Sequence, residues 1–139
     1  MRKLTISLII LIAGDLLVIL SFVWIGRSNH SLAISDIVAG FSTALPFVLS
    51  WFVIMPWFGI YKADISIHWK RLVPRLLLGW AVAGPVGLML RALFLGRPLF
   101  VGIIPAFAVI TLAYIGLTAL VWRLGYIWWA NRTYSAKLN

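Results

Sequence analysis

Asp15 is the residue whose type and position most clearly suggest a chemical role, because its carboxylate lies in the middle of the apolar run Leu4–Ile25. A run of that length can cross a bilayer as a helix, which takes roughly 20 apolar residues. A carboxylate near the centre of such a helix costs about 2.5–3.5 kcal/mol on insertion scales. Acidic residues at this depth are typical of ion pathways and of charge pairs between helices. Groups elsewhere in the chain must therefore offset the cost.

Arg91 is the predicted partner of Asp15. Counting about 1.5 Å per residue from the outer end of each apolar run places Asp15 roughly 16 Å deep and Arg91 roughly 7 Å deep. An arginine side chain that reaches inward would bridge this offset if the two helices adjoin. In one alternative Arg91 extends outward to the lipid headgroups. In another, Asp15 is protonated and either hydrogen-bonds to nearby hydroxyls or carries protons. The sequence leaves these alternatives open.

Polar and helix-bending residues recur at a similar depth in the other apolar runs. Pro46 and Pro85 each lack a backbone N–H, so each frees a carbonyl and bends its helix. Broken helices beside an acidic residue mark binding sites and proton paths in transporters. Proline and small residues are also common where transmembrane helices simply pack together. The predicted midplane polar site consists of Asp15, Ser42, Thr43, Pro46, Pro85, Arg91 and Thr111.

The composition and the apolar runs predict an all-α, polytopic membrane protein. Of the 139 residues 63% are hydrophobic and 11% are charged, whereas a soluble domain has about 25% charged residues. Helices are expected because lipid cannot satisfy open backbone groups. One transmembrane domain, residues 1–123, would contain four helices at about 4–25, 37–60, 76–95 and 101–122. A short basic and aromatic tail, 124–139, would either lie in the membrane interface or continue the fourth helix.

The distribution of cations predicts that both termini are cytoplasmic. If all four runs span, the N-terminus, the loop Tyr61–Arg75 and the tail share one side of the membrane. That side carries nine lysines and arginines, and the other side carries three, namely Arg27, Arg91 and Arg97. Such a bias places the richer side in the cytoplasm. There the cations are expected to meet anionic lipid headgroups.

We predict no enzyme activity, no cofactor and no metal site. The chain has no cysteine, two histidines and only three acidic residues, which excludes thiolate metal sites and cysteine nucleophiles. His30 and His68 fall on opposite sides of the membrane and cannot share one ion. The net charge of +9 is explained by topology, so we expect no nucleic-acid partner. His30, together with Arg27 and Arg97, would form a polar group at the outer surface.

The order of several residues resembles a known family. These residues are Gly14-Asp15, Phe22, Gly26-Arg27, His30, Pro46-Phe47, Trp51, Arg91-Ala92-Leu93, Gly96-Arg97, Phe107 and Trp122-Arg123. Over roughly Gly14–Arg123 the chain resembles the prokaryotic integral-membrane family called domain of unknown function 3054. The resemblance implies a small, multi-pass, four-helix protein of the cell inner (cytoplasmic) membrane, and it implies no substrate. It also implies that the family's recurrent polar or bend positions are Asp15, Arg27, His30, Pro46, Arg91 and Arg97.

Two functions follow as hypotheses. A small transporter-like subunit would bind a proton or cation at Asp15, with Arg91 as the counter-charge. Because four helices make a thin pathway, this subunit would form a homo-oligomer or join a larger assembly. Alternatively, a structural or accessory subunit of a larger membrane complex would use the same pair only to fix helix register. An enzyme acting on lipid is disfavoured by the shortage of catalytic groups.

Overall fold

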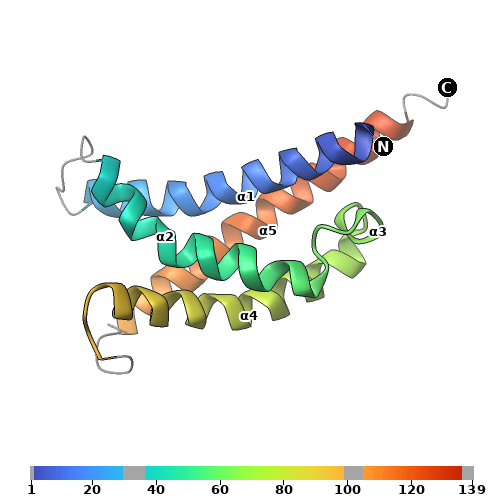
Figure 1. Cartoon of the computed structure of the whole chain (residues 1–139). Coiled ribbons are helices and arrows are strands. Elements are labelled where there is room, and N and C mark those ends of the chain that lie inside the picture. The colour runs from blue at the N-terminus through green and yellow to red at the C-terminus, as the bar shows by residue number, and fades with distance from the viewer. Residues whose placement is uncertain (1, 30–36, 99–104, 136–139) are drawn as a thin grey trace.

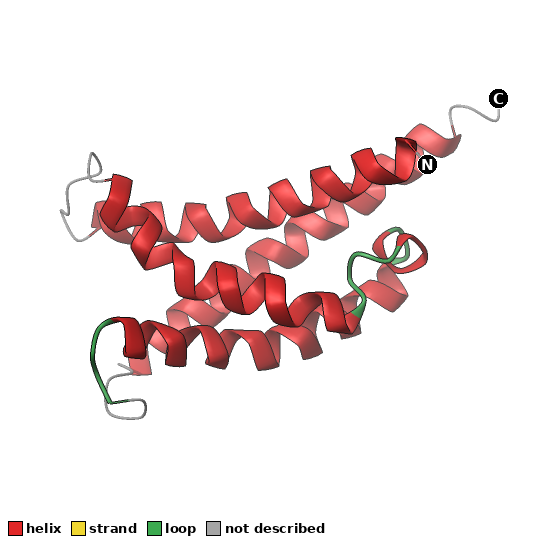
Figure 2. Cartoon of the chain, in the orientation of Figure 1, coloured by secondary structure: helices red, strands yellow, loops and turns green. Residues whose placement is uncertain are grey.

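The structure, a computed structural model, describes residues 2–29, 37–98 and 105–135 and is helical almost throughout these ranges (Figures 1 and 2). The described residues contain no strand, which confirms the predicted all-α class. The elements, in chain order, are α1 (Arg2–Asn29), α2 (Ile37–Ile54), the 3-10 helix η1 (Met55–Phe58), α3 (Ala63–Ser66), α4 (Trp69–Phe94) and α5 (Pro105–Ser135).

The four long helices form a bundle in which consecutive long helices run in opposite directions (Figure 1). Within the described residues, four helical segments are long and apolar enough to cross a membrane: Ser7–Gly26 in α1, Gly40–Phe58 in α2 and η1, Trp69–Phe94 in α4 and Pro105–Thr133 in α5. The first turns of α1, the short helix α3 and the last turns of α5 lie at the same end of the bundle (Figure 1). We call this end of the molecule the α3 end.

The largest differences from the helix boundaries predicted from the apolar runs are at the start of α4 and the end of α5. Helix α4 begins at Trp69, seven residues before the predicted start, so Lys70, Arg71 and Arg75 belong to its first two turns. Helix α5 continues to Ser135, so most of the predicted tail extends the fourth helix. In both places charged residues interrupt the apolar run without ending the helix, because lysine and arginine are good helix formers.

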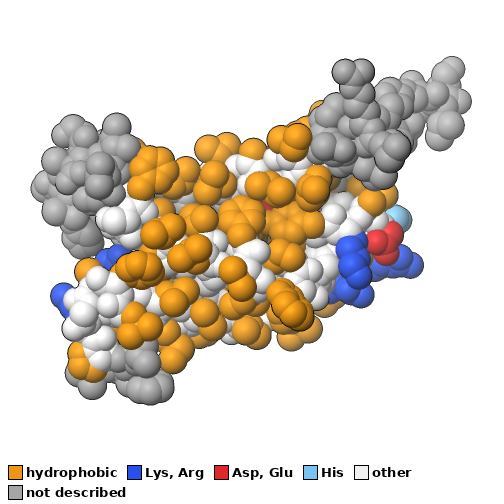
Figure 3. All heavy atoms as spheres, in the orientation of Figure 1, with side chains coloured by type: hydrophobic (Ala, Val, Ile, Leu, Met, Phe, Trp, Pro, Cys, Tyr) orange, Lys and Arg blue, Asp and Glu red, His pale blue; other side chains and the backbone are white. Residues whose placement is uncertain are grey.

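The core of the bundle is formed by buried apolar side chains, which include Phe22, Phe47, Trp51, Trp80 and Ile115. Many large apolar side chains are also exposed, and they are spread over the face shown in Figure 3 between the two ends. Charged side chains gather at the α3 end, where Arg71 and Asp64 form an exposed ion pair at 3.7 Å (Figure 3). An apolar belt between polar ends is the surface expected of a bundle that has lipid as its solvent.

A tight turn at Gly59 connects the second span to the α3 segment. Gly59 adopts a left-handed conformation with φ of 72°, which costs glycine nothing but is unfavourable for other residues. Its backbone N–H donates to the carbonyl of Pro56 at 2.9 Å and thereby ends η1. The turn brings Ile60 and Tyr61 back into the bundle, and both contribute to the site described next.

Candidate functional site: a buried charge cluster

Asp15 forms a two-pronged ion pair with Arg123 in the interior of the bundle. The Nε of Arg123 donates to Oδ1 of Asp15 at 3.0 Å, and its Nη2 donates to Oδ2 at 2.5 Å. Both side chains are fully buried. This parallel arrangement is the strongest geometry available to an arginine and a carboxylate. Arg123 therefore supplies the counter-charge that the buried carboxylate requires.

Two further side chains complete the shell around Asp15. The hydroxyl of Tyr61 donates to Oδ2 of Asp15 at 2.6 Å. The indole Nε1 of Trp51 lies 3.2 Å from the same oxygen and 3.1 Å from the Tyr61 hydroxyl, so its proton is shared between them. With the two donors of Arg123, the carboxylate receives four hydrogen bonds, about as many as its lone pairs accept.

The remaining contacts of Arg123 tie the cluster to the rest of the fold. Its Nη1 donates to the backbone carbonyl of Ile60 at 3.2 Å, and its guanidinium lies 4.8 Å from the centre of the Tyr61 ring. Trp51 in turn packs against Trp80 of α4 with the ring centres 5.5 Å apart. The cluster thus joins α1, α2, α4, α5 and the turn after η1.

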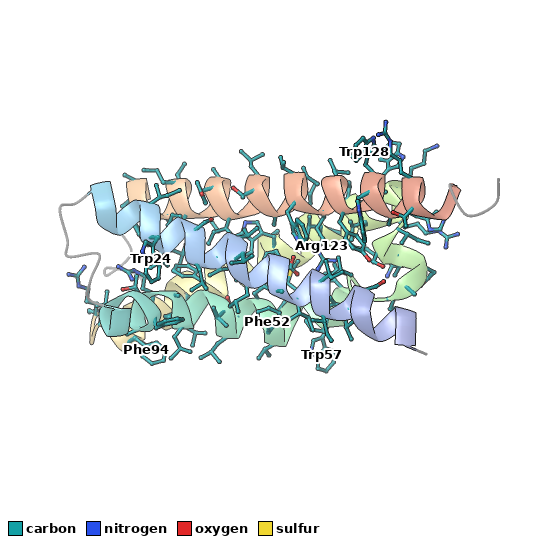
Figure 4. All side chains as sticks on the ribbon, turned by 90° about the horizontal axis from the view of Figure 1, so that it is seen from above. Trp24, Phe52, Trp57, Phe94, Arg123 and Trp128 are labelled. Atoms are coloured by element: carbon teal, nitrogen blue, oxygen red, sulfur yellow. The ribbon has the colours of Figure 1, made fainter. Side chains whose placement is uncertain are left out.

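A close approach between α1 and α5 places Asp15 beside Arg123. The indole of Trp122 lies directly over Gly14, where a Cβ atom would come within 2.0 Å of the ring. Only glycine leaves room for this contact. Gly14 and Trp122 each precede one member of the ion pair along the chain, so the contact also sets the height of Asp15 relative to Arg123. Figure 4 shows Arg123 between the ribbons of α1 and α5, with Trp128 on the outside.

The environment keeps Tyr61 protonated as a donor. Burial raises the pKa of the Tyr61 hydroxyl, and the adjacent negative charge of Asp15 raises it further. A tyrosine that keeps its proton can donate to the carboxylate, as the Tyr61 hydroxyl does here. Among the described residues no group of three or more histidine, cysteine or acidic side chains is placed to hold a metal ion. Within the described residues, the Asp15 carboxylate therefore receives three hydrogen bonds at Oδ2 and one at Oδ1.

The predicted pairing of Asp15 with Arg91 is wrong. Arg91 lies near the far end of α4, where its guanidinium stacks 4.7 Å from the centre of the Phe107 ring. The residue of α4 that packs against the cluster is Trp80, and Arg91 follows it by eleven residues, or about 16 Å along the helix axis. The depth argument missed the true partner because the fourth apolar run ends at residue 122, whereas α5 continues to Ser135 and buries Arg123.

The other predicted midplane residues lie at different levels of the bundle. Thr43 precedes Trp51 by eight residues, or about 12 Å along α2, and Ser42 lies one residue further. Thr111 is buried, and its hydroxyl donates to the carbonyl of Phe107 in its own helix at 2.7 Å. Pro46 is buried inside α2 and Pro85 is exposed inside α4. These residues bend or line the helices, but the described contacts of the Asp15 carboxylate come from Trp51, Tyr61 and Arg123.

The predicted outer-surface residues are only partly described. Arg27 belongs to the last turn of α1, and His30 lies outside the described residues. Arg97 is exposed, and its backbone N–H donates to the carbonyl of Ala92 at the end of α4. His68, at the α3 end, contacts the backbone carbonyl of Asp64 through Nδ1 at 2.7 Å.

Arg123, Tyr61 and Trp51 are the site residues that the depth argument missed. Arg123 directly follows an apolar run and was assigned to the membrane surface. A useful signal was present, because Arg123 is followed by further apolar and aromatic residues, including Tyr126, Ile127 and Trp128. An arginine with apolar residues on both sides is expected inside a longer helix, where it needs a buried partner.

The fold and the buried charge pair define a small membrane protein built from four spanning helices. A family model described as "Protein of unknown function (DUF3054)" matches residues 12–126, and the chain belongs to this family. The matched segment covers most of the chain and includes both Asp15 and Arg123. The comparisons with curated proteins and with solved structures found no match.

Proposed function

We propose that the protein is a structural or accessory subunit of a larger membrane assembly, in which the Asp15–Arg123 pair fixes the register of the four helices. This proposal rests on one observation: the fully buried carboxylate of Asp15 already receives four hydrogen bonds from protein side chains. A group that binds and releases a transported ion needs a free coordination position and a path to water. The geometry around Asp15 instead favours a fixed structural role.

The exposure of α5 favours docking onto other membrane components. Only 17% of its spanning window is buried within the chain, compared with 33–44% for the other three spans. Helix α5 therefore offers the largest lateral surface, on which Val109, Ile110 and Leu117 are exposed. A second copy of the chain or a different membrane protein would pack there, in the cell inner membrane. The excess of cations at the α3 end supports a cytoplasmic position for that end.

The decisive experiment separates assembly from transport. Asp15→Asn and Arg123→Gln would be expressed at the native level in the original host, and membrane abundance and co-purifying proteins would be measured in mild detergent. The proposal predicts that each single variant lowers abundance and loses the co-purifying assembly, and that the double variant regains part of both. A variant that keeps its abundance and its assembly but loses ion flux in reconstituted vesicles would overturn the proposal in favour of a transporter.

A further inference from the structure

A groove runs along the outer side of the contact between α1 and α5, away from the charge cluster. Its first part, about 450 Å³, is lined by residues that include Ala13, Leu17, Ser21 and Thr118. Its second part, about 410 Å³, is lined by Val121, Gly125, Tyr126 and Trp129. Ile10 and Trp122 border both parts, so the two form one continuous furrow that leads toward the α3 end.

The shape and lining of the groove suit a flexible apolar chain. By residue count the groove follows roughly 20 Å of the two helices, and both of its parts are open along the molecular surface. Its walls are almost entirely apolar. An extended hydrocarbon chain meets both requirements.

A cation lies beyond the end of the groove. Thr118, Gly125 and Arg132 are spaced seven residues apart, so they share one face of α5, with Arg132 about 10 Å beyond Gly125. The guanidinium of Arg132 stacks 4.0 Å from the ring of Trp128. The two acidic residues in the described ranges are already paired, Asp15 with Arg123 and Asp64 with Arg71. Thus no carboxylate among the described residues neutralises Arg132.

We propose that this groove is a binding site for an anionic membrane lipid, with one acyl chain along α1 and α5 and the headgroup at Arg132. Trp129 and Tyr126 line the end of the groove nearest Arg132, where amphipathic aromatic rings favour the headgroup level. Arg132 supplies the positive charge that favours a headgroup with a net negative charge. The site is on a different surface from the charge cluster and does not depend on the proposed role of that cluster.

The test uses native mass spectrometry of the full chain in mild detergent, titrated with phosphatidylglycerol or with phosphatidylcholine of the same acyl chains. The wild type is expected to bind one phosphatidylglycerol more tightly than phosphatidylcholine. Gly125→Leu should abolish this site, because a Cβ at Gly125 meets no atom within 4 Å and a larger side chain enters the groove without disturbing the fold. Gly26→Leu is the matched control, since a Cβ at Gly26 likewise meets no described atom within 4 Å and Gly26 does not line the groove.

Arg132→Gln separates the headgroup from the acyl chain. Removal of one cation near a lipid surface should reduce the preference for phosphatidylglycerol about fivefold while binding of phosphatidylcholine persists. The proposal is overturned if Gly125→Leu binds phosphatidylglycerol as the wild type does, or if Arg132→Gln keeps the full preference. It is also overturned if Gly125→Leu dissociates a homodimer without changing lipid binding, because the groove would then receive a second copy of the chain.

Discussion

Two arginines at different levels of the bundle differ in how their positive charges are accommodated among apolar side chains. Arg123 is completely buried and forms a two-pronged pair with Asp15. Arg91 is only partly buried and stacks on the face of Phe107. A long side chain near a helix end reaches the surface by extending outward, whereas an arginine fixed in the interior requires an anion. The bundle is therefore stabilised by an ion pair at the level of Asp15 and by stacking of a guanidinium on an aromatic ring at the level of Arg91.

Arg123→Leu should produce the largest effect. It leaves the buried carboxylate of Asp15 without its counter-charge, and removing one partner of a buried pair costs about 3–5 kcal/mol. The free energy of unfolding in mixed detergent micelles and the abundance in membranes would both report this loss. Equal losses for Arg123→Leu and Arg91→Leu would remove the distinction between the two arginines.

Tyr61→Phe should have the next largest effect at the same level. It deletes the 2.6 Å hydrogen bond to Asp15, and a hydrogen bond to a charged group contributes about 1.5–3 kcal/mol. Tyr114→Phe is the matched control, because its hydroxyl contacts the uncharged Ser21 at 3.3 Å. If the control destabilises the bundle as much in the same unfolding titration, the Tyr61 hydroxyl has no special role.

Gly14→Ala tests whether the contact between α1 and α5 positions the pair. The new Cβ would clash with the indole of Trp122, and overpacking of this kind costs about 1–3 kcal/mol. Gly26→Ala, whose new Cβ meets no described atom within 4 Å, should be neutral or stabilising because alanine is the better helix former. A stable Gly14→Ala variant would show that Trp122 moves freely and does not set the height of Asp15.

The smallest effect is expected at Arg91. Arg91→Leu removes a stacking contact with Phe107, which contributes about 0.5–1 kcal/mol at a partly exposed position, and it leaves no buried charge behind. The same unfolding titration should detect a small loss. A loss comparable to that of Arg123→Leu would indicate that Arg91 has a buried anionic partner.

The sequence predicted the architecture well because bilayer physics imposes it. Four long apolar runs specify four helices, and the cost of burying Asp15 correctly indicated that a partner had to exist. The identity of the partner could not be read in this way. Apolar run length marks the lipid-facing core of each helix, but α5 continues to Ser135 through Arg123. Which residues of α5 face Asp15 depends on the close contact at Gly14, and this contact is a property of helix packing.

The contribution of Tyr61 was equally hidden from the sequence. Tyr61 lies in a segment whose sequence predicts a basic connecting loop. The left-handed turn at Gly59 directs this segment back into the bundle. Trp51 packs between helices and is 1% exposed. Its hydrogen bond to Asp15 follows from the relative height of α1 and α2, which the sequence does not encode in any short motif.

A pair of double-mutant cycles on the free energy of unfolding tests the central claim most directly. One cycle combines Asp15→Asn with Arg123→Gln, and the other combines Asp15→Asn with Arg91→Gln. The account predicts a coupling of about 1–3 kcal/mol for Asp15 with Arg123, and additivity within about 0.5 kcal/mol for Asp15 with Arg91. Additive effects for Asp15 and Arg123, or strong coupling between Asp15 and Arg91, would contradict the structural role assigned to the buried pair.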